Sequence, residues 1–368
     1  MPPARIALLL HSNYRSGGNL AMLRHALYLA GLGHAVEVVF QEDWHGTDLG
    51  FLPGHTALPT RLLADWPAGE VVDIAITNWW VSAYAFPALP ARQYAFFRHG
   101  EEKPLFANRV LDAAIDMLLR ERFVWFAVSP PLMEALRAEG QAPVLVPNGV
   151  EVARFAAAAP ALPPCHGTLR VLVEGSAGAP HKRVNATIEM LRSVPGVEIV
   201  HMAADGSRPA LPVDHALGAV PHGEVAGVYA ACDLLVKLST QEAFPLPVLE
   251  QFAAGGTAIV ARFAGSEQFI EDGVNALLVE QDHAERAARA ALLGLMAEPV
   301  RLAGLRRAAQ ATARRFDWEA ACRSFADELL AACPRRAGPP QPLPVVEAYR
   351  ACALDGLALW AEREARRG

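Results

Sequence analysis

The sequence predicts an α/β protein built from two doubly wound, Rossmann-like domains with a substrate cleft between them. Short apolar runs alternate with longer amphipathic segments, which is the pattern of parallel strands covered by helices. This alternation stops in a turn-rich stretch near the middle of the chain and then resumes. The length of 368 residues also fits two domains better than one.

The first half opens with a buried strand at residues 6–10, followed by a glycine-containing loop and an amphipathic helix over 19–30. Further strands are predicted at 36–40, 72–77, 94–97, 124–128 and 144–146, and further helices at 105–119 and 131–139. Residues 44–69 are polar and irregular, so we expect a flap or a long connection there.

The middle of the chain predicts a hinge. Asn148-Gly149 is a turn signal. Residues 151–167 are rich in Ala and Pro and poor in charge, which is typical of a linker. We therefore expect an N-terminal domain over 1–150, a hinge over 151–167 and a C-terminal domain over 168–333.

The second half repeats the alternation and then becomes helical. Strands are predicted at 169–173, 197–201, 234–238, 257–261 and 276–279, and helices at 284–296, 300–314 and 318–332. Residues 334–368 are expected to form a Pro-rich spacer and a final helix over 345–367.

Bulk properties exclude several classes of protein. The net charge of −6 argues against broad nucleic-acid binding, and the apolar runs are too short to span a membrane. The five cysteines are scattered without metal-ligand spacing. Residues 1–5 lead directly into the first strand and leave no room for a signal peptide, so a cytoplasmic location is expected.

The most informative stretch is residues 241–250, which places two carboxylates around a loop-to-helix junction. Pro247 suits the first helical position, and Gly255-Gly256 would end the helix. Glu242 would then lie in the loop and Glu250 in the first turn. Because the N–H groups of a helix start attract anions, this segment suits a sugar joined to a diphosphate. The alternative is an acidic first turn that only complements the helix dipole.

These residues resemble the retaining, nucleotide-sugar-dependent glycosyltransferases of family 4, which have the two-domain GT-B fold. The family signature is matched at Asp233, Ser239, Glu242, Phe244, Leu246, Pro247, Glu250 and Gly256. The chain departs from it at Pro245, where the family usually has Gly. The string Pro-Asn-Gly-Val-x-x-x-x-Phe at 147–155 also resembles the family's hinge. The resemblance implies that the N-terminal domain faces the acceptor and that the C-terminal domain binds the nucleotide-sugar donor. It also implies a last helix that packs back on the N-terminal domain.

A second candidate site lies after the strand that ends near Gly175, where Lys182 and Arg183 precede a helix. Phosphate binding needs close backbone approach and a cation. The resemblance implies that Lys182 holds the donor diphosphate, but Ser176 stands where the family has a second cation, an Arg. The alternative is a solvated basic helix start.

Lys237 is unusual because it interrupts an apolar strand, and a buried lysine is costly unless it meets an anion. We expect it to replace the missing cation at the donor site; the alternative is a lysine that snorkels at the rim of the sheet. The Lys-Arg-Val and Lys-Leu-Ser strings at 182–184 and 237–239 resemble a rhamnosyltransferase-like subgroup, which does not identify the donor.

The N-terminal half offers further candidates at the carboxyl ends of strands, where α/β sheets bind ligands. The resemblance implies that His99 contacts a sugar hydroxyl and that the Gly17-Gly18 loop lines the cleft. Arg98 is a second candidate for phosphate or acceptor. The alternatives are a structural loop histidine and, for Trp79-Trp80, packing rather than stacking on a sugar.

The expected function is transfer of a sugar from a nucleoside diphosphate to a hydroxyl of a saccharide, lipid-linked or small-molecule acceptor, in cell-envelope glycan or glycoconjugate synthesis. Lys182 and Lys237 would stabilise the leaving diphosphate, Glu250 would bind the ribose, and Glu242 would contact the transferred sugar. No metal motif is evident, so neither a metal nor a resident cofactor is expected.

Other readings stay open. A phosphorylase or epimerase of the same fold is one. A glycoside hydrolase using Glu242 and Glu250 as acid and base is a second. A non-catalytic sugar-nucleotide-binding protein is a third. Peripheral contact with the inner face of the membrane is also left open.

Overall fold

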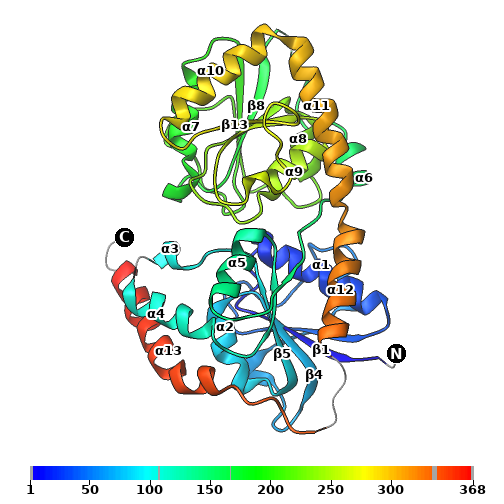
Figure 1. The fold of residues 1–368 in the computed structure, drawn as a ribbon. Helices are drawn as coiled ribbons and strands as arrows, with labels where there is room; N and C mark the ends of the chain where they lie inside the picture. Colours follow the sequence, from blue (N-terminus) through cyan, green and yellow to red (C-terminus); the bar gives the residue numbers. More distant parts are fainter. Residues whose placement is uncertain (1–2, 107, 166, 334–337, 366–368) are drawn as a thin grey trace. The chain divides into compact units, whose positions relative to one another are not determined.

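The computed structural model describes residues 3–106, 108–165, 167–333 and 338–365 (Figure 1). The chain divides into two compact units: unit 1 comprises Met1–Pro147 and Cys322–Gly368, and unit 2 comprises Asn148–Ala321. Each unit holds one parallel sheet with flanking helices, so the α/β prediction is confirmed. Parts of the predicted spacer and final helix, residues 334–337 and 366–367, lie outside the described residues.

The sheet of unit 1 has the order β3-β2-β1-β4-β5-β6-β7, and every pair is parallel. Its strands are β1 Arg5–Leu10, β2 Ala35–Phe40, β3 Thr60–Leu62, β4 Val72–Thr77, β5 Ala91–Arg98, β6 Val124–Ala127 and β7 Val144–Leu145. The central strand β1 is buried from its second residue onward, because helices cover both faces of the sheet.

Five helices of unit 1 follow these strands: α1 Gly17–Gly31, α2 Trp80–Ala85, α3 Lys103–Phe106, α4 Arg109–Leu118 and α5 Pro130–Ala138. The single helix predicted over 105–119 is therefore wrong, since two helices occupy this region. Asn108 explains the break, because its Oδ1 accepts from the N–H of Val110 at 2.9 Å and starts a new helix.

The segment expected as a flap, residues 44–69, contains a short edge strand and two 3₁₀ turns. The strand β3 pairs in parallel with β2, and the turns are η1 His55–Ala57 and η2 Leu63–Asp65. Three strand residues flanked by turns are too few for an alternation signal, so the sequence pattern did not reveal β3.

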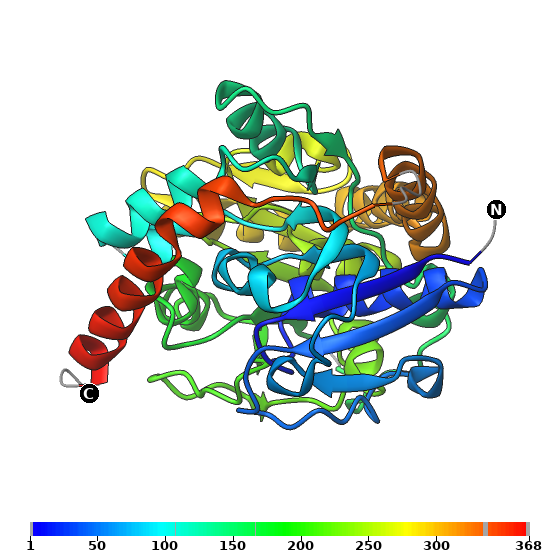
Figure 2. The same cartoon turned by 90° about the horizontal axis from the view of Figure 1, so that it is seen from below.

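The last helix, α13 Pro344–Ala365, packs along α4 and α2 in unit 1 (Figures 1 and 2). Its first turn is held by Glu121, a fully buried side chain whose Oε2 accepts from the N–H groups of Val345 at 2.9 Å and Val346 at 3.0 Å. A carboxylate at this position satisfies two donors of the helix start and complements its dipole.

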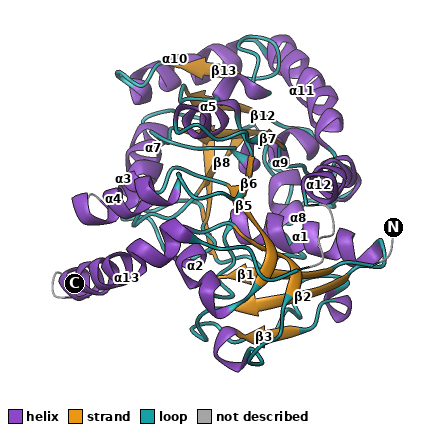
Figure 3. Cartoon of the chain, turned by 60° about the horizontal axis from the view of Figure 1, so that its bottom comes forward, coloured by secondary structure: helices purple, strands orange, loops and turns teal. Residues whose placement is uncertain are grey.

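The sheet of unit 2 has the order β10-β9-β8-β11-β12-β13, again with parallel pairs. Figure 3 labels β8, β12 and β13 of this sheet. Its strands are β8 Leu169–Glu174, β9 Val197–Met202, β10 His215–Gly218, β11 Leu234–Lys237, β12 Thr257–Ala261 and β13 Leu277–Val279. The edge strand β10 was not predicted, because its polar start hides it from a search for apolar runs.

Unit 2 contains α6 Val152–Ala156, α7 Val184–Arg192, α8 Val225–Ala230, α9 Leu246–Ala253, α10 Ala284–Ala297 and α11 Pro299–Ala313, and α12 Trp318–Ala332 begins in it. The segment expected as a linker thus starts with a helix. The α6 helix packs on α8 and α9, and its Phe155 is buried 5.6 Å from the ring of Tyr229.

The turn at Asn148-Gly149 brings two distant segments of unit 2 together. The N–H of Val150 donates to the carbonyl of Phe316 at 2.7 Å, and the N–H of Trp318 donates to the carbonyl of Val150 at 3.1 Å. A Cβ at Gly149 would lie 2.7 Å from the Cα of Trp318, so only glycine allows this approach.

Along the described residues, no helix combines the length and apolar character that a bilayer crossing requires.

Candidate functional site

The carboxyl edge of the unit 2 sheet carries four charged side chains in one network. Glu174 ends β8 and Lys237 ends β11, its neighbour in the sheet. Glu242 lies in the loop before α9, and Lys182 ends the 3₁₀ turn η4 Pro180–Lys182. The Nζ of Lys182 lies 2.8 Å from Glu242 Oε1, and the Nζ of Lys237 lies 3.1 Å from the same oxygen and 2.9 Å from Glu174 Oε2. The sequence predicted three of these residues and missed Glu174.

Lys237 is enclosed by this network, with a side chain only 2% exposed. Burial by itself lowers the pKa of its ammonium, but the charges of Glu174 and Glu242 outweigh that effect and hold the pKa above its ordinary value. The lysine therefore stays charged inside the unit.

Glu242 is the most strongly perturbed carboxylate of the network. Burial raises its pKa, but Lys237 and Lys182 together overcome burial and lower the pKa to about 2. The side chain is consequently an anion at neutral pH.

Gly175 and Lys182 pack against each other after β8. Gly175 adopts φ +133°, and the side-chain carbons of Lys182 lie 3.5–3.6 Å from the position that a Cβ there would take. With 24% of its side chain exposed, Lys182 pairs with Glu242 and still reaches solvent. Arg183 starts α7 in a left-handed conformation with φ +50°. The Oγ of Ser176 lies 2.5 Å from Asp205 Oδ2, so this hydroxyl already has a strong acceptor.

The start of α9 differs from the prediction. The helix begins at Leu246, so Pro247 is its second residue and Glu250 lies in the second turn, not the first. The N–H of Leu246 donates to the carbonyl of Phe244 at 2.8 Å, and the N–H of Val248 donates to Pro245 at 2.9 Å. Pro247 has no N–H. The expected free donors at this helix start are therefore engaged by the chain itself, because the turn at Pro245 folds back on them.

Phe244 belongs to the core of unit 2. Its ring is buried and lies 5.2 Å from that of Phe269 and 6.2 Å from that of Phe316. The aromatic position of the motif thus anchors the loop that carries Glu242.

Glu250 has a partner that the sequence did not reveal. The buried hydroxyl of Tyr229 on α8 donates to its carboxylate, and burial together with the Glu250 charge raises the pKa of Tyr229. A buried tyrosine hydroxyl needs an acceptor. That need is the one signal that could have led to Tyr229, but the sequence analysis did not use it.

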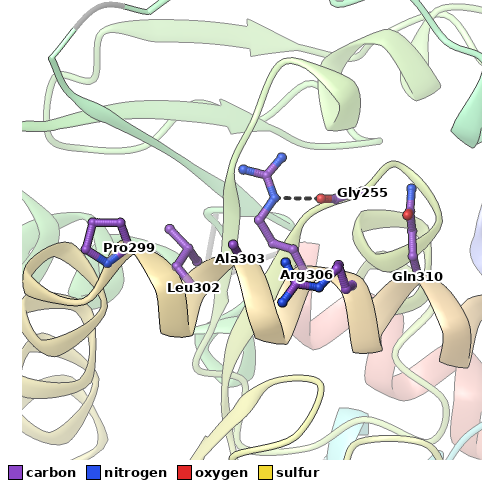
Figure 4. Close-up of a pocket in the computed structure, with 7 residues that line it drawn as sticks. Gly255, Pro299, Leu302, Ala303, Arg306 and Gln310 are labelled. Atoms are coloured by element: carbon purple, nitrogen blue, oxygen red, sulfur yellow. Dashed lines mark hydrogen bonds between the residues drawn. The ribbon is translucent and has the colours of Figure 1, made fainter.

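Asp233 and Gly255 both bond to Arg306, which ties this part of the scaffold together. Asp233 Oδ2 accepts from the N–H of Arg170 at 3.1 Å, and Asp233 Oδ1 lies 3.1 Å from Arg306 Nη1. Arg306 Nε also donates to the carbonyl of Gly255 at 2.7 Å, and both residues line a cavity of about 450 Å³ beside α11 (Figure 4). This cavity is lined by α11 and Gly255 and contains none of the four networked charges.

The carboxyl edge of the unit 1 sheet brings together residues from β4, β5 and α1. A Cβ at Gly18, in the first turn of α1, would lie 3.3 Å from Asn78 Nδ2 and 3.5 Å from His99 Cβ. His99 Nδ1 lies 2.9 Å from the carbonyl of Phe97. Gly17 is the first residue of α1, and the structure adds Asn78, which the sequence analysis did not single out.

Arg98 points inward and is 1% exposed. Its Nη2 lies 2.9 Å from Glu101 Oε2, and its Nε lies 3.8 Å from Glu102 Oε2. Burial raises the pKa of Glu102 to about 7, although the Arg98 charge acts in the opposite direction. Trp80 is also in the core, 1% exposed, which fits a packing role.

In the described parts of the chain, no group of three or more His, Cys, Asp and Glu side chains is arranged to hold a metal ion.

Known proteins are similar to this chain in sequence around the motif. Residues 215–315 match the family model of glycosyl transferases group 1. D-inositol 3-phosphate glycosyltransferase of Segniliparus rotundus is 38% identical over 113 residues, which cover 31% of this chain and 24% of that protein. The enzyme of the same name from Acidothermus cellulolyticus is 28% identical over 69% of this chain and 63% of its own length. The chain thus matches about a quarter of the first of these relatives.

Solved structures share the fold. Sucrose-phosphate synthase from Thermosynechococcus elongatus superposes with a TM-score of 0.72 at 17% identity, covering 89% of this chain and 100% of that one. Anabaena Alr3699/HepE in complex with UDP-glucose superposes with a TM-score of 0.70 at 18% identity, with the same coverage. The chain thus carries, over the motif, a region similar to glycosyl transferases group 1, and it shares the two-sheet GT-B fold of these solved structures.

Proposed function

We propose that the protein transfers a sugar, with retention at the anomeric carbon, from a nucleoside-diphosphate donor to a hydroxyl of an acceptor. The observation that carries this proposal is the pairing of Glu242 with Lys182 at the carboxyl edge of unit 2, inside the region similar to glycosyltransferases. Because Anabaena Alr3699/HepE was solved with UDP and with UDP-glucose, a uridine diphosphate sugar is the first donor to test.

The charges of Lys182 and Glu242 would stabilise different parts of the transition state. The leaving diphosphate gains negative charge in the transition state, and the reachable ammonium of Lys182 would stabilise it. The anomeric carbon gains positive charge, which the ionised Glu242 would stabilise. Glu250, oriented by Tyr229, would accept hydrogen bonds from the ribose hydroxyls.

The acceptor side of the proposal rests on unit 1. Ligands of parallel α/β sheets bind at the carboxyl ends of strands, and there His99, Asn78 and Gly18 lie together. We propose that His99 contacts a sugar hydroxyl there and that the acceptor is a saccharide, a lipid-linked glycan or a small molecule. A role in cell-envelope glycan or glycoconjugate synthesis is part of this proposal.

A glycoside hydrolase is a weaker proposal. Its general acid must hold a proton near neutral pH, whereas the two lysines lower the pKa of Glu242 to about 2. A non-catalytic sugar-nucleotide-binding protein has a specific observation in its favour: Ser176 replaces a family cation and is bonded to Asp205, and the N–H groups of Leu246 and Val248 are engaged.

Thermal stabilisation by UDP, GDP, dTDP and ADP tests the donor site. A nucleotide at one hundred times its dissociation constant should stabilise the protein by about 2.7 kcal/mol. We expect one nucleotide to stabilise the wild type, and to stabilise Glu250→Ala and Lys182→Ala less. Glu189→Ala is the matched control, because this glutamate is exposed on α7 in the same unit.

Turnover separates the two remaining readings. Release of the nucleotide from its sugar, unchanged by EDTA, is the result expected of a metal-independent transferase. Binding of the nucleotide without release from any donor of the panel would favour the non-catalytic protein. Stabilisation by none of the nucleotides would overturn both.

A further inference from the structure

We infer that the buried Lys237 and the partly buried Glu174 form a positioning pair that fixes the direction and the charge of the Glu242 carboxylate. This inference rests on the proposed function, because it gives Glu242 a role at the transferred sugar. It differs from the sequence-based hypothesis, in which Lys237 contacts the donor diphosphate itself.

The first argument is accessibility. The side chain of Lys237 is 2% exposed, whereas that of Lys182 is 24% exposed. A diphosphate that arrives from solvent can reach Lys182 without disturbing the network. To reach Lys237 it would have to displace a carboxylate from a charged hydrogen bond, which is expensive in a buried site.

The second argument is the direction of the bonds. Both lysines approach the same oxygen of Glu242: Nζ of Lys182 lies 2.8 Å from Oε1, and Nζ of Lys237 lies 3.1 Å from it. Two ammonium groups on one oxygen restrict rotation of the carboxylate and leave Oε2 outside both contacts. Lys237 thereby presents Oε2 of Glu242 as an ionised acceptor for a ligand.

The third argument is the balance of charge. Two lysines face two carboxylates, and Glu174 takes the second bond of Lys237 at 2.9 Å. Glu174 and Lys237 end two adjacent parallel strands, so the sheet itself sets their separation. Glu174 thus neutralises one lysine charge and anchors Nζ of Lys237 at the edge of the sheet, from which it reaches Glu242.

Three variants test the inference: Lys237→Met, Glu174→Gln and the double variant Lys237→Met/Glu174→Gln. If Lys237 acts on Glu242, Lys237→Met leaves that carboxylate with one cation. The acid limb of the kcat/KM profile should then move up by at least about one pH unit. We also expect kcat to fall at least tenfold, with little change in KM for the donor.

The double variant is the decisive comparison. It restores the balance of charge but not the cation beside Glu242, so it should keep the shifted acid limb. If Lys237 only neutralised Glu174, the double variant would regain the wild-type profile, and the inference would be overturned. Glu174→Gln alone keeps both lysines on Glu242 and should show no upward shift.

A readout without turnover keeps this test separate from that of the proposed function. The protonated carboxyl of Glu242 can be followed by infrared difference spectroscopy between the wild type and Glu242→Gln. We expect the Glu242 carboxyl to titrate at higher pH in Lys237→Met than in the wild type. If its titration is unchanged, the inference is wrong even if the enzyme is active. A wild type that never releases nucleotide would instead contradict the proposed function alone.

Discussion

Two glutamates, one in each unit, have pKa values shifted in opposite directions. Glu242 in unit 2 has two lysine ammonium groups within 3.1 Å, and its pKa falls to about 2. Glu102 in unit 1 has Arg98 Nε at 3.8 Å, and Arg98 also bonds Glu101 at 2.9 Å; the pKa of Glu102 rises to about 7. Burial raises the pKa of both groups, so the number and closeness of the cations decide the charge.

The same contrast separates the two sheet edges. The edge of unit 2 holds a neutralised network of four charges, suited to the changing charge of a departing diphosphate. At the edge of unit 1, an amide, an imidazole and a glycine lie together, which suits the neutral hydroxyls of a sugar.

The largest difference is expected between Glu242→Gln and Glu102→Gln. Glu242→Gln leaves two lysines facing Glu174 alone, so unit 2 should lose about 3 kcal/mol of unfolding free energy, and nucleotide release should fall about 100-fold or more. Glu102→Gln replaces a carboxyl that is readily protonated and should change both quantities little at pH 6. Pulsed hydrogen exchange during urea unfolding assigns each transition to a unit. Equal losses from the two variants would refute the comparison.

The two units should also respond to pH with opposite signs. Because the pKa of Glu242 is depressed, its ionisation stabilises unit 2 at pH values above the ordinary glutamate pKa of 4.5. This contribution is lost as the pH falls toward 2. The raised pKa of Glu102 stabilises unit 1 below 4.5, and this contribution is lost as the pH rises through about 7. Each contribution is at most about 3 kcal/mol.

Unfolding by urea between pH 4 and pH 8, read by the same exchange method, tests the two signs. In Glu102→Gln, the unfolding free energy of unit 1 should fall less steeply as the pH rises. In Glu242→Gln, the unfolding free energy of unit 2 should fall less steeply as the pH is lowered. If the unfolding free energy of unit 1 falls with pH as steeply in Glu102→Gln as in the wild type, another titrating group causes the fall.

Tyr229→Phe should weaken UDP binding about tenfold or more, because loss of one hydrogen bond to a charged group costs about 1.5 kcal/mol or more. The hydroxyl holds Glu250, the proposed partner of the ribose. Isothermal titration calorimetry measures the change, and Tyr84→Phe is a matched control, since it removes a buried tyrosine hydroxyl from unit 1. If the affinity for UDP is unaltered in Tyr229→Phe, the proposal that Glu250 binds the ribose of the nucleotide is contradicted.

The smallest effect on nucleotide binding is expected for His99→Gln. Because His99 belongs to the proposed acceptor side, UDP affinity should stay within about twofold, while transfer to an acceptor should slow by about tenfold. Calorimetry with UDP and an assay of transfer measure the two quantities. Weakened UDP binding comparable with that of Tyr229→Phe would remove the division of labour between the two edges.

Much of the architecture was readable from local pattern. Parallel strands covered on both faces are continuous apolar runs, so β1, β4 and β12 were located to within one residue. Motif resemblance singled out Glu242 and Lys182 one by one, but only the structure showed that they pair. Short edge strands such as β3 and β10 carry too few residues for a pattern, and they were missed.

By itself, the sequence determined the α/β class, the order of the principal strands and the segment around Glu242 and Glu250. Only the tertiary structure decided which charges meet. Glu174 and Lys237 are 63 positions apart and pair because β8 and β11 are neighbours, and Tyr229 reaches Glu250 from another helix. Such contacts depend on strand order, helix packing and burial. A local pattern records which residues can carry charge, whereas the folded neighbourhood decides whether they keep it.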